Sequence, residues 1–182
     1  LSKSLNAFKG LPWKIVIIID RTLQNRSSLR PENAKRFNHG QGFVIGHQWT
    51  NIVLIINDIL IPLRPIPFYS QRYCQDHGIE YSTEHNLVVD YISRLNLEDY
   101  ISSYDSRDVL VLTDSGYDNK QIENAIADKH WTFIIALGKT RSVKSDTLYP
   151  STPKSKQWSH VATFFRHHRR LKWQTIWIMR DG

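Results

Sequence analysis

Two aspartates stand at the ends of strongly hydrophobic runs, and carboxylates in such places can hold metal ions. Asp20 closes the run 14–20, and Asp114 closes the run 108–114. Runs of apolar, mostly β-branched residues predict strands that are buried on both faces. A carboxylate at the end of such a strand lies at the rim of the sheet, where open α/β folds place their sites. Two such acids that converge on one point predict a divalent-metal site.

The first aspartate-bearing strand is followed by a predicted antiparallel hairpin. Residues 21–41 form a polar excursion with few structural signals. Residues 43–56 then predict a long strand, Asn57-Asp58 is a favoured two-residue turn, and residues 59–63 return. The opening unit is therefore one strand plus a hairpin.

Alternating helices and strands follow this hairpin. Ser82 or Thr83 can cap a helix whose apolar positions have the spacing of one helical face. After the second aspartate-bearing strand, Asp118 and Gln121 resemble a capping box that opens another helix. Residues 131–137 predict one more buried strand. The predicted order is β-β-β-α-β-α-β, a mixed α/β sheet.

Length and composition narrow the class of protein. A chain of 182 residues with 41% hydrophobic content can form a real core, and no apolar run approaches the length of a membrane helix. The lone Cys74 cannot form an internal disulfide and no secretory signal is present, so a cytoplasmic location is expected. The chain starts at Leu1 and stops at a hairpin-turn signal, so we expect it to be a fragment.

The net charge of +7 is concentrated near the C-terminus. Residues 1–138 hold 14 Lys/Arg against 15 Asp/Glu, whereas residues 139–182 hold 10 against 2. This distribution predicts contact with a polyanion, and a solvated basic tail is the alternative. Aromatic residues interleaved with the cations, among them Trp158 and Trp173, argue against a mere tail.

Composition also predicts three parts. Residues 1–141 form the core, and the Ser/Thr/Pro/Lys-rich residues 142–157 form a linker. Residues 158–182 begin a β-rich subdomain, with predicted strands at 158–165 and 173–179 joined by a basic turn.

The predicted strand order is that of the ribonuclease H-like fold, in which the first and fourth strands are adjacent and parallel. The residues also resemble a family. The segments Asp20-Arg-Thr22, Gly46-His47, Leu112–Tyr117 and Leu137-Gly-Lys139 look like those of DDE transposases of the insertion-sequence type, in the IS4-like group. The resemblance covers roughly residues 10–180.

This resemblance implies metal-dependent cutting and joining of DNA ends. Asp20 would bridge two Mg²⁺ ions (or Mn²⁺), and Asp114 would hold one of them. The implied partners are double-stranded DNA, as transposon ends and target, and further copies of the chain within a nucleoid-associated complex. The third acid of the family is a glutamate on a later helix. No glutamate follows Lys139, so we expect that acid beyond Gly182 and expect this fragment alone to be inactive.

Clustered cations are the expected DNA contacts. Phosphate contacts provide affinity and salt dependence rather than sequence choice. Trp158 and Trp173 could stack on a displaced base, but packing within the extra sheet is the plainer interpretation. The expected DNA-contacting residues are Arg21, Arg26, Arg30, Lys35, Arg36, Lys139, Arg141, Lys144, Arg166, Arg169 and Arg170.

Several alternatives stay open at this point. Asp114 could be a turn former or helix cap, and His47 a packed strand residue. A haloacid-dehalogenase-type phosphatase would need an acid at Thr22 and would not begin with three strands. A non-catalytic DNA-binding module derived from a transposase, or another ribonuclease H-like nuclease such as a resolvase, fits the same strands.

Overall fold

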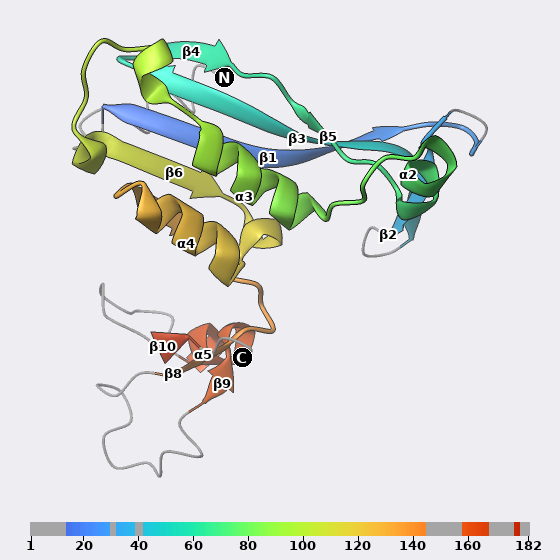
Figure 1. Cartoon of the computed structure of the whole chain (residues 1–182). Coiled ribbons are helices and arrows are strands. Elements are labelled where there is room, and N and C mark those ends of the chain that lie inside the picture. The colour runs from blue at the N-terminus through green and yellow to red at the C-terminus, as the bar shows by residue number, and fades with distance from the viewer. Residues whose placement is uncertain (1–13, 30–31, 39–41, 145–157, 168–176, 179–182) are drawn as a thin grey trace. The chain divides into compact units, whose positions relative to one another are not determined.

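The structure is a computed structural model that describes residues 14–29, 32–38, 42–144, 158–167 and 177–178 (Figure 1). The chain forms two compact units, residues 1–135 and residues 136–182, and each is described by itself.

A seven-stranded mixed sheet is the framework of the first unit. Strand β1 (Ile15–Asn25) pairs antiparallel with β3 (Phe43–Ile56) and parallel with β6 (Val109–Thr113). Strand β7 (Thr132–Ile135) pairs parallel with β6. The far edge of β3 pairs in turn with β2 (Lys35–Asn38), β5 (Ile66–Pro67) and β4 (Ile59–Pro62). The hairpin strands β3 and β4 with β1, β6 and β7 have the ribonuclease H-like order, which confirms the predicted fold class.

Strand β1 is longer than predicted. It continues beyond Asp20 to Asn25, paired with β3 throughout, so the prediction that Asp20 ends its strand was wrong. Most of the added residues are polar, which suits their exposed positions in this extension of the sheet. Because loops are also polar, the sequence pattern there predicted a loop. Strand β2 lies in the same stretch that was predicted to be an irregular excursion. We call the three-stranded part made by residues 21–26, 35–38 and 43–50 the distal ribbon.

Two helices cover one face of the sheet. Helices α3 (Glu84–Arg94) and α4 (Lys120–Asp128) lie side by side against β1 and β6 (Figure 1). Their buried residues, including Ile92 and Ile126, join Ile17 and Val111 of the strands in the hydrophobic core. No helix among the described residues is long and apolar enough to cross a membrane.

The connections are short helices. Helix α2 (Gln71–His77), which the sequence patterns did not predict, begins at the cap Ser70 and ends at Gly78 in the left-handed conformation. Three single 3-10 turns lie at Leu97–Asp99, Ser106–Asp108 and Ser115–Tyr117.

The helix caps confirm one prediction and correct another. Thr83 caps α3, because its hydroxyl accepts a hydrogen bond from the Asn86 amide at 3.2 Å. Asn119, and not Asp118, caps α4, because the chain makes one further turn before the helix begins.

We expect Thr83→Ala to lower the free energy of unfolding by about 1 kcal/mol, since one amide of the first turn of α3 loses its acceptor. Chemical denaturation of the whole chain measures the change. Thr83→Ser keeps the hydroxyl and serves as the control, and an alanine variant as stable as the serine variant would contradict the assignment of the cap.

Strand β7 is an exposed edge, not the buried strand that was predicted. Ile134 is 53% exposed and Phe133 is 37% exposed. The apolar pattern of residues 131–137 reflects their strand propensity, whereas Trp131, just before the strand, is the buried residue.

The second unit contains a small three-stranded sheet. Its strands β8 (Ser142–Lys144), β9 (Ser159–His160) and β10 (Trp177–Ile178) pair in the order β10-β8-β9. The predicted linker thus begins with a strand. The predicted strand at 158–165 is mostly helix α5 (Val161–His167), so Arg166 lies on a helix rather than in a basic turn. Residues 145–157 and 168–176 of these predictions lie outside the described residues.

Candidate functional site

The two predicted acids occupy equivalent positions on adjacent strands. The parallel pairing of β1 with β6 ends with Ile19 opposite Thr113; the next residues are Asp20, still within β1, and Asp114, directly after β6. Both side chains are exposed. Within the described residues, the Asp20 carboxylate has no hydrogen bond or ion pair.

Asp114 has a second role as a cap. Its Oδ1 accepts a hydrogen bond from the Gly116 amide at 2.9 Å, which starts the 3-10 turn. The alternative interpretation of Asp114 as a turn former is therefore correct, but it engages only one oxygen. This bond fixes the orientation of the carboxylate, and the geometry leaves the other oxygen for a ligand.

A polar network that the sequence patterns did not predict lies under this loop. Glu84, the first residue of α3, receives Arg21 through two contacts, Nε to Oε1 at 3.0 Å and Nη2 to Oε2 at 2.6 Å. Thr50 and Tyr117 also donate to Glu84 Oε1, at 3.2 and 2.9 Å. The network joins β1, β3, α3 and the turn after Asp114 through a single carboxylate.

Electrostatics agree with this geometry. Burial raises the pKa of Tyr117; its hydrogen bond with Thr50 lowers the pKa, and the neighbouring charge of Glu84 raises it. Burial lowers the pKa of Arg21, but the hydrogen bond and charge of Glu84, with smaller effects from Tyr117 and Asp114, raise it above its usual value. A Cβ at Gly116 would lie 3.0 Å from Asp114 Oδ1 and 3.5 Å from Arg21 Nη2, so the guanidinium lies close to the candidate metal ligand.

His85 ties the same helix end to the loop a second time. Its Nε2 lies 2.9 Å from the Gly116 carbonyl oxygen, and its Nδ1 lies 3.4 Å from the Asn119 side-chain amide. With the carbonyl as acceptor, Nε2 carries the proton and Nδ1 accepts. Glu84 and His85 together hold the segment 114–119, so the position of Asp114 is set by α3 as well as by β6.

The residues present fit a hard divalent cation in part. Exposed carboxylate oxygens are the ligands that Mg²⁺ prefers, and this ion commonly takes only one or two carboxylates and keeps several waters. Among the described residues, no group of three His, Cys, Asp or Glu could hold a metal. Glu84 is the carboxylate tied to this loop, but Arg21, Thr50 and Tyr117 already engage it.

The cations that were expected to contact DNA differ in their surroundings: some contact other side chains of the protein, and others are exposed. Arg21 is bound to Glu84, and Arg26 donates to the side chain of Gln24 at 2.9 Å. In the second unit, Lys144 lies 5.6 Å over the ring of Trp158, which agrees with packing rather than base stacking for that tryptophan. Lys139 and Arg166 are exposed, and the Arg141 carbonyl accepts from the Val161 amide. Arg30, Arg169, Arg170 and Trp173 lie outside the described residues.

The fold and the paired acids define a ribonuclease H-like domain with a candidate metal site. Comparison with protein-family models finds no match, and no curated protein matches. Among solved structures, the chain is distantly similar to the Mos1 mariner paired end complex with Mn, with a TM-score of 0.33 and 14% sequence identity. The match covers 72% of this chain and 39% of that one, so the chain spans well under half of the matched structure.

Proposed function

We propose that this chain is part of the catalytic core of a DDE transposase, in the IS4-like group, that cuts and joins DNA ends with Mg²⁺ or Mn²⁺. The observation that carries the proposal is the β1–β6 register, in which the last pair, Ile19 and Thr113, directly precedes Asp20 and Asp114. Two strands whose acids occupy the same step of one sheet provide oxygen ligands at one point. The order of strands and helices supports the same family.

Each residue has a specific task in this proposal. When bound, two divalent ions activate the attacking hydroxyl and stabilise the leaving oxygen of the phosphodiester. Asp20 would hold both ions and Asp114 would hold one. The Gly116 amide and the Glu84 network keep Asp114 in place, and the Arg21 guanidinium compensates the charge of the loop. In this proposal the chain acts with further copies on paired ends of double-stranded DNA.

Metal binding is the direct test, because it does not require catalytic activity. We expect the chain to bind Mn²⁺, and the double variant Asp20→Asn, Asp114→Asn to bind it at least tenfold more weakly, since two anionic ligands become neutral amides. Electron paramagnetic resonance of free Mn²⁺ during titration measures the affinity. Asp128→Asn changes an exposed acid at the end of α4 and is the matched control.

Equal Mn²⁺ affinity of the asparagine double variant and of the unchanged chain would contradict the metal site. Retained DNA binding in that case would favour a non-catalytic DNA-binding module. Circular dichroism of each variant checks that the fold persists, which is expected because both acids are exposed.

A further inference from the structure

The two faces of the distal ribbon differ in what covers them. Side chains alternate between faces along a strand, and the register assigns each residue to one of them. On β3, the residues Gly46, Gln48 and Thr50 are buried, whereas the alternate residues are at least partly exposed. We call this second side, which bears the exposed residues, the open face.

The register places the candidate acid on the open face. Asp20 pairs with Asn51 and Thr22 pairs with Trp49, both partners being open-face residues of β3. Asp20, Thr22, Gln24 and Arg26 are therefore successive open-face positions of the same strand. Arg21 alternates with them and lies on the covered face, where Glu84 binds it.

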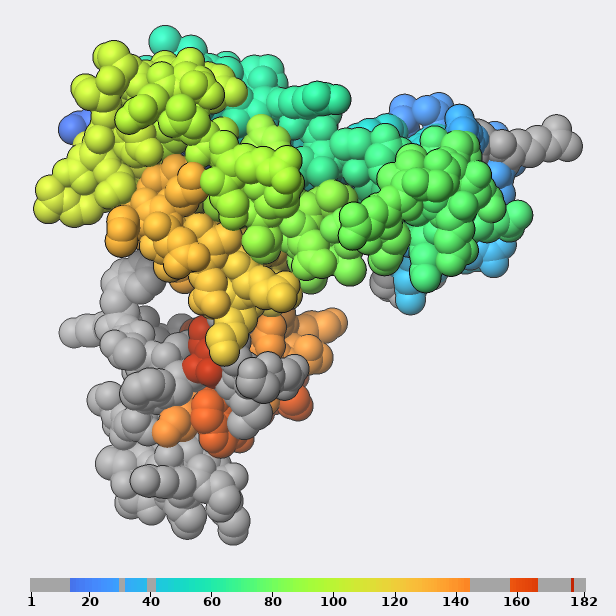
Figure 2. All heavy atoms as spheres, viewed as in Figure 1, coloured from blue at the N-terminus to red at the C-terminus, as the bar shows by residue number. Residues whose placement is uncertain are grey.

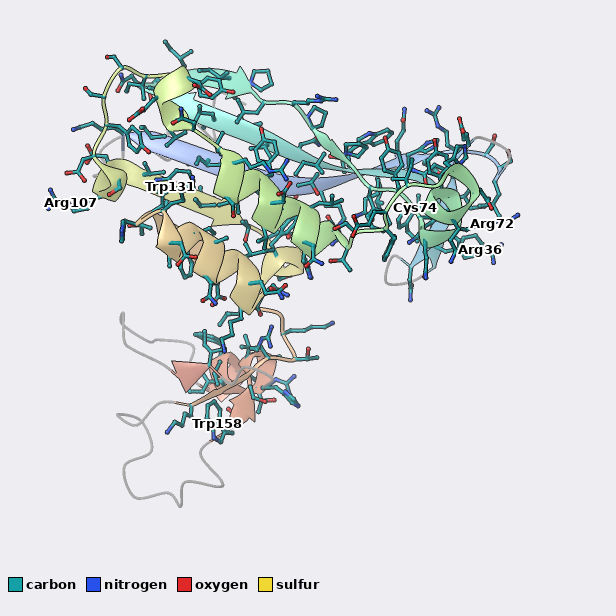
Figure 3. All side chains as sticks on the ribbon, viewed as in Figure 1. Arg36, Arg72, Cys74, Arg107, Trp131 and Trp158 are labelled. Atoms are coloured by element: carbon teal, nitrogen blue, oxygen red, sulfur yellow. The ribbon has the colours of Figure 1, made fainter. Side chains whose placement is uncertain are left out.

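Two arginines are neighbours of the same residue, Ile45, at the far end of the open face. The Arg26 amide donates to the Ile45 carbonyl at 2.7 Å, and Arg36 pairs with the same Ile45 from β2. Arg26, Ile45 and Arg36 thus form one row across three strands. The Arg36 guanidinium also lies 4.3 Å over the ring of Phe43, which is 56% exposed. Figure 3 shows Arg36 near β2 and α2, at the far end of the ribbon. Such a cation–aromatic contact holds the guanidinium in one orientation.

Charge makes this face suitable for a polyanion. Among the described open-face positions from Asp20 to this row, Asp20 itself is the only acid. The other positions include Thr22 and Trp49, whereas the Nε2 of His47 already lies 2.7 Å from the Glu32 carbonyl oxygen. Lys35, by contrast, lies on the covered face, 4.6 Å over Phe68. Of the cations expected to contact DNA in this stretch, the register thus selects Arg26 and Arg36.

The distance from the acid to the arginine row suits duplex DNA. Six residues of strand separate Asp20 from Arg26, about 20 Å at the usual rise. That length corresponds to about six base pairs along one strand of a duplex. Figure 2 shows the end of the ribbon and α2 standing out from the rest of the first unit.

We propose that the open face of the distal ribbon binds duplex DNA, and we call this surface the track. On it, Arg26 and Arg36 bind phosphates about six base pairs from the phosphodiester that is cut beside Asp20. The proposal rests on the proposed function for the identity of the polyanion. Phe43 acts by orienting Arg36 and does not need to contact a base.

Salt-dependent DNA binding by the full chain tests the track. We expect Arg26→Ala, Arg36→Ala to reduce the slope of log Kobs against log salt by about 1.8, or about 0.9 for each lost phosphate contact. Fluorescence anisotropy of a short labelled duplex, titrated between about 50 and 200 mM salt, measures the slope. The double variant Arg26→Lys, Arg36→Lys should keep most of it.

The control removes two charges from the covered side. Arg72 and Arg94 lie on α2 and α3 with highly exposed side chains, so Arg72→Ala, Arg94→Ala makes the same change in net charge. An equal change of the salt slope in both alanine double variants would overturn the proposal. Failure of the unchanged chain to bind duplex DNA would also overturn it, as would a reduced slope that is seen only with single-stranded DNA. The outcome is independent of Mn²⁺ binding by Asp20 and Asp114, so the metal site and the track can fail separately.

Discussion

Glu84→Ala is expected to lower the free energy of unfolding by about 3 kcal/mol, because a single side chain satisfies three partners. The variant leaves the Arg21 guanidinium without its counter-ion. It also removes the acceptor of Tyr117, whose ring is fully buried. Chemical denaturation monitored by circular dichroism measures the loss.

Two controls separate the charge from the hydrogen bonds. Glu84→Gln keeps an oxygen for Thr50 and Tyr117 and should cost about half as much. Asp90→Ala breaks the exposed pair with Arg94 on the same helix and should cost no more than about 0.5 kcal/mol. A Glu84→Ala variant that loses no more than the Asp90→Ala variant would show that the network is not a structural centre.

The same network gives a pH dependence with a definite sign. In the unfolded chain Tyr117 releases its proton near its ordinary pKa of 10.0. In the folded chain burial raises the pKa of Tyr117 above that value. The contribution of Tyr117 to stability is therefore fully present below pH 10 and is lost as the pH rises toward the folded-state pKa. Tyr117→Phe should remove this alkaline loss.

The sheet was predictable because the apolar, mostly β-branched sequences of its central strands favour a buried strand. Runs such as 15–19 and 109–113 consist of residues that suit a strand buried on both faces, and their order specifies the ribonuclease H-like connection. The distal ribbon was not predictable in this way. The residues that β1 and β2 contribute to it are mostly polar and at least partly exposed, and pairing with β3 rather than an apolar pattern makes them strands.

The site was predictable only where a residue type stands at a strand end. Asp20 and Asp114 were singled out as candidate ligands because each follows an apolar run, although Asp20 proved to lie within its strand. Glu84 has no local signal beyond a helix start, since an acid is favourable in any first turn. Its partners Arg21, Thr50 and Tyr117 are far apart in the sequence, so only the tertiary fold brings them together.

Gly46→Ala is expected to disrupt the distal ribbon and to lower the free energy of unfolding by about 3 kcal/mol. A Cβ at this position would overlap the carbonyl oxygen of Gln24 and lie 2.9 Å from its carbonyl carbon. Both are backbone atoms of the paired strand and cannot rotate away, so β1 and β3 must separate locally. An isolated glycine inside a strand pattern is typical of such a close backbone approach.

Amide hydrogen exchange distinguishes local separation from general instability. Exchange should accelerate most at Arg26, whose amide bonds to the Ile45 carbonyl next to the substituted residue, and least at the central pairs of β1 with β6. Gly42→Ala is the matched control, since a Cβ there would meet no atom within 4 Å. If the two alanine variants exchange alike in the ribbon, close packing of β1 on Gly46 does not hold the strands together. If Gly46→Ala alone opens the ribbon, the salt slope of DNA binding should also decrease. The reason is that Arg26 and Arg36 are both positioned by their pairing with Ile45.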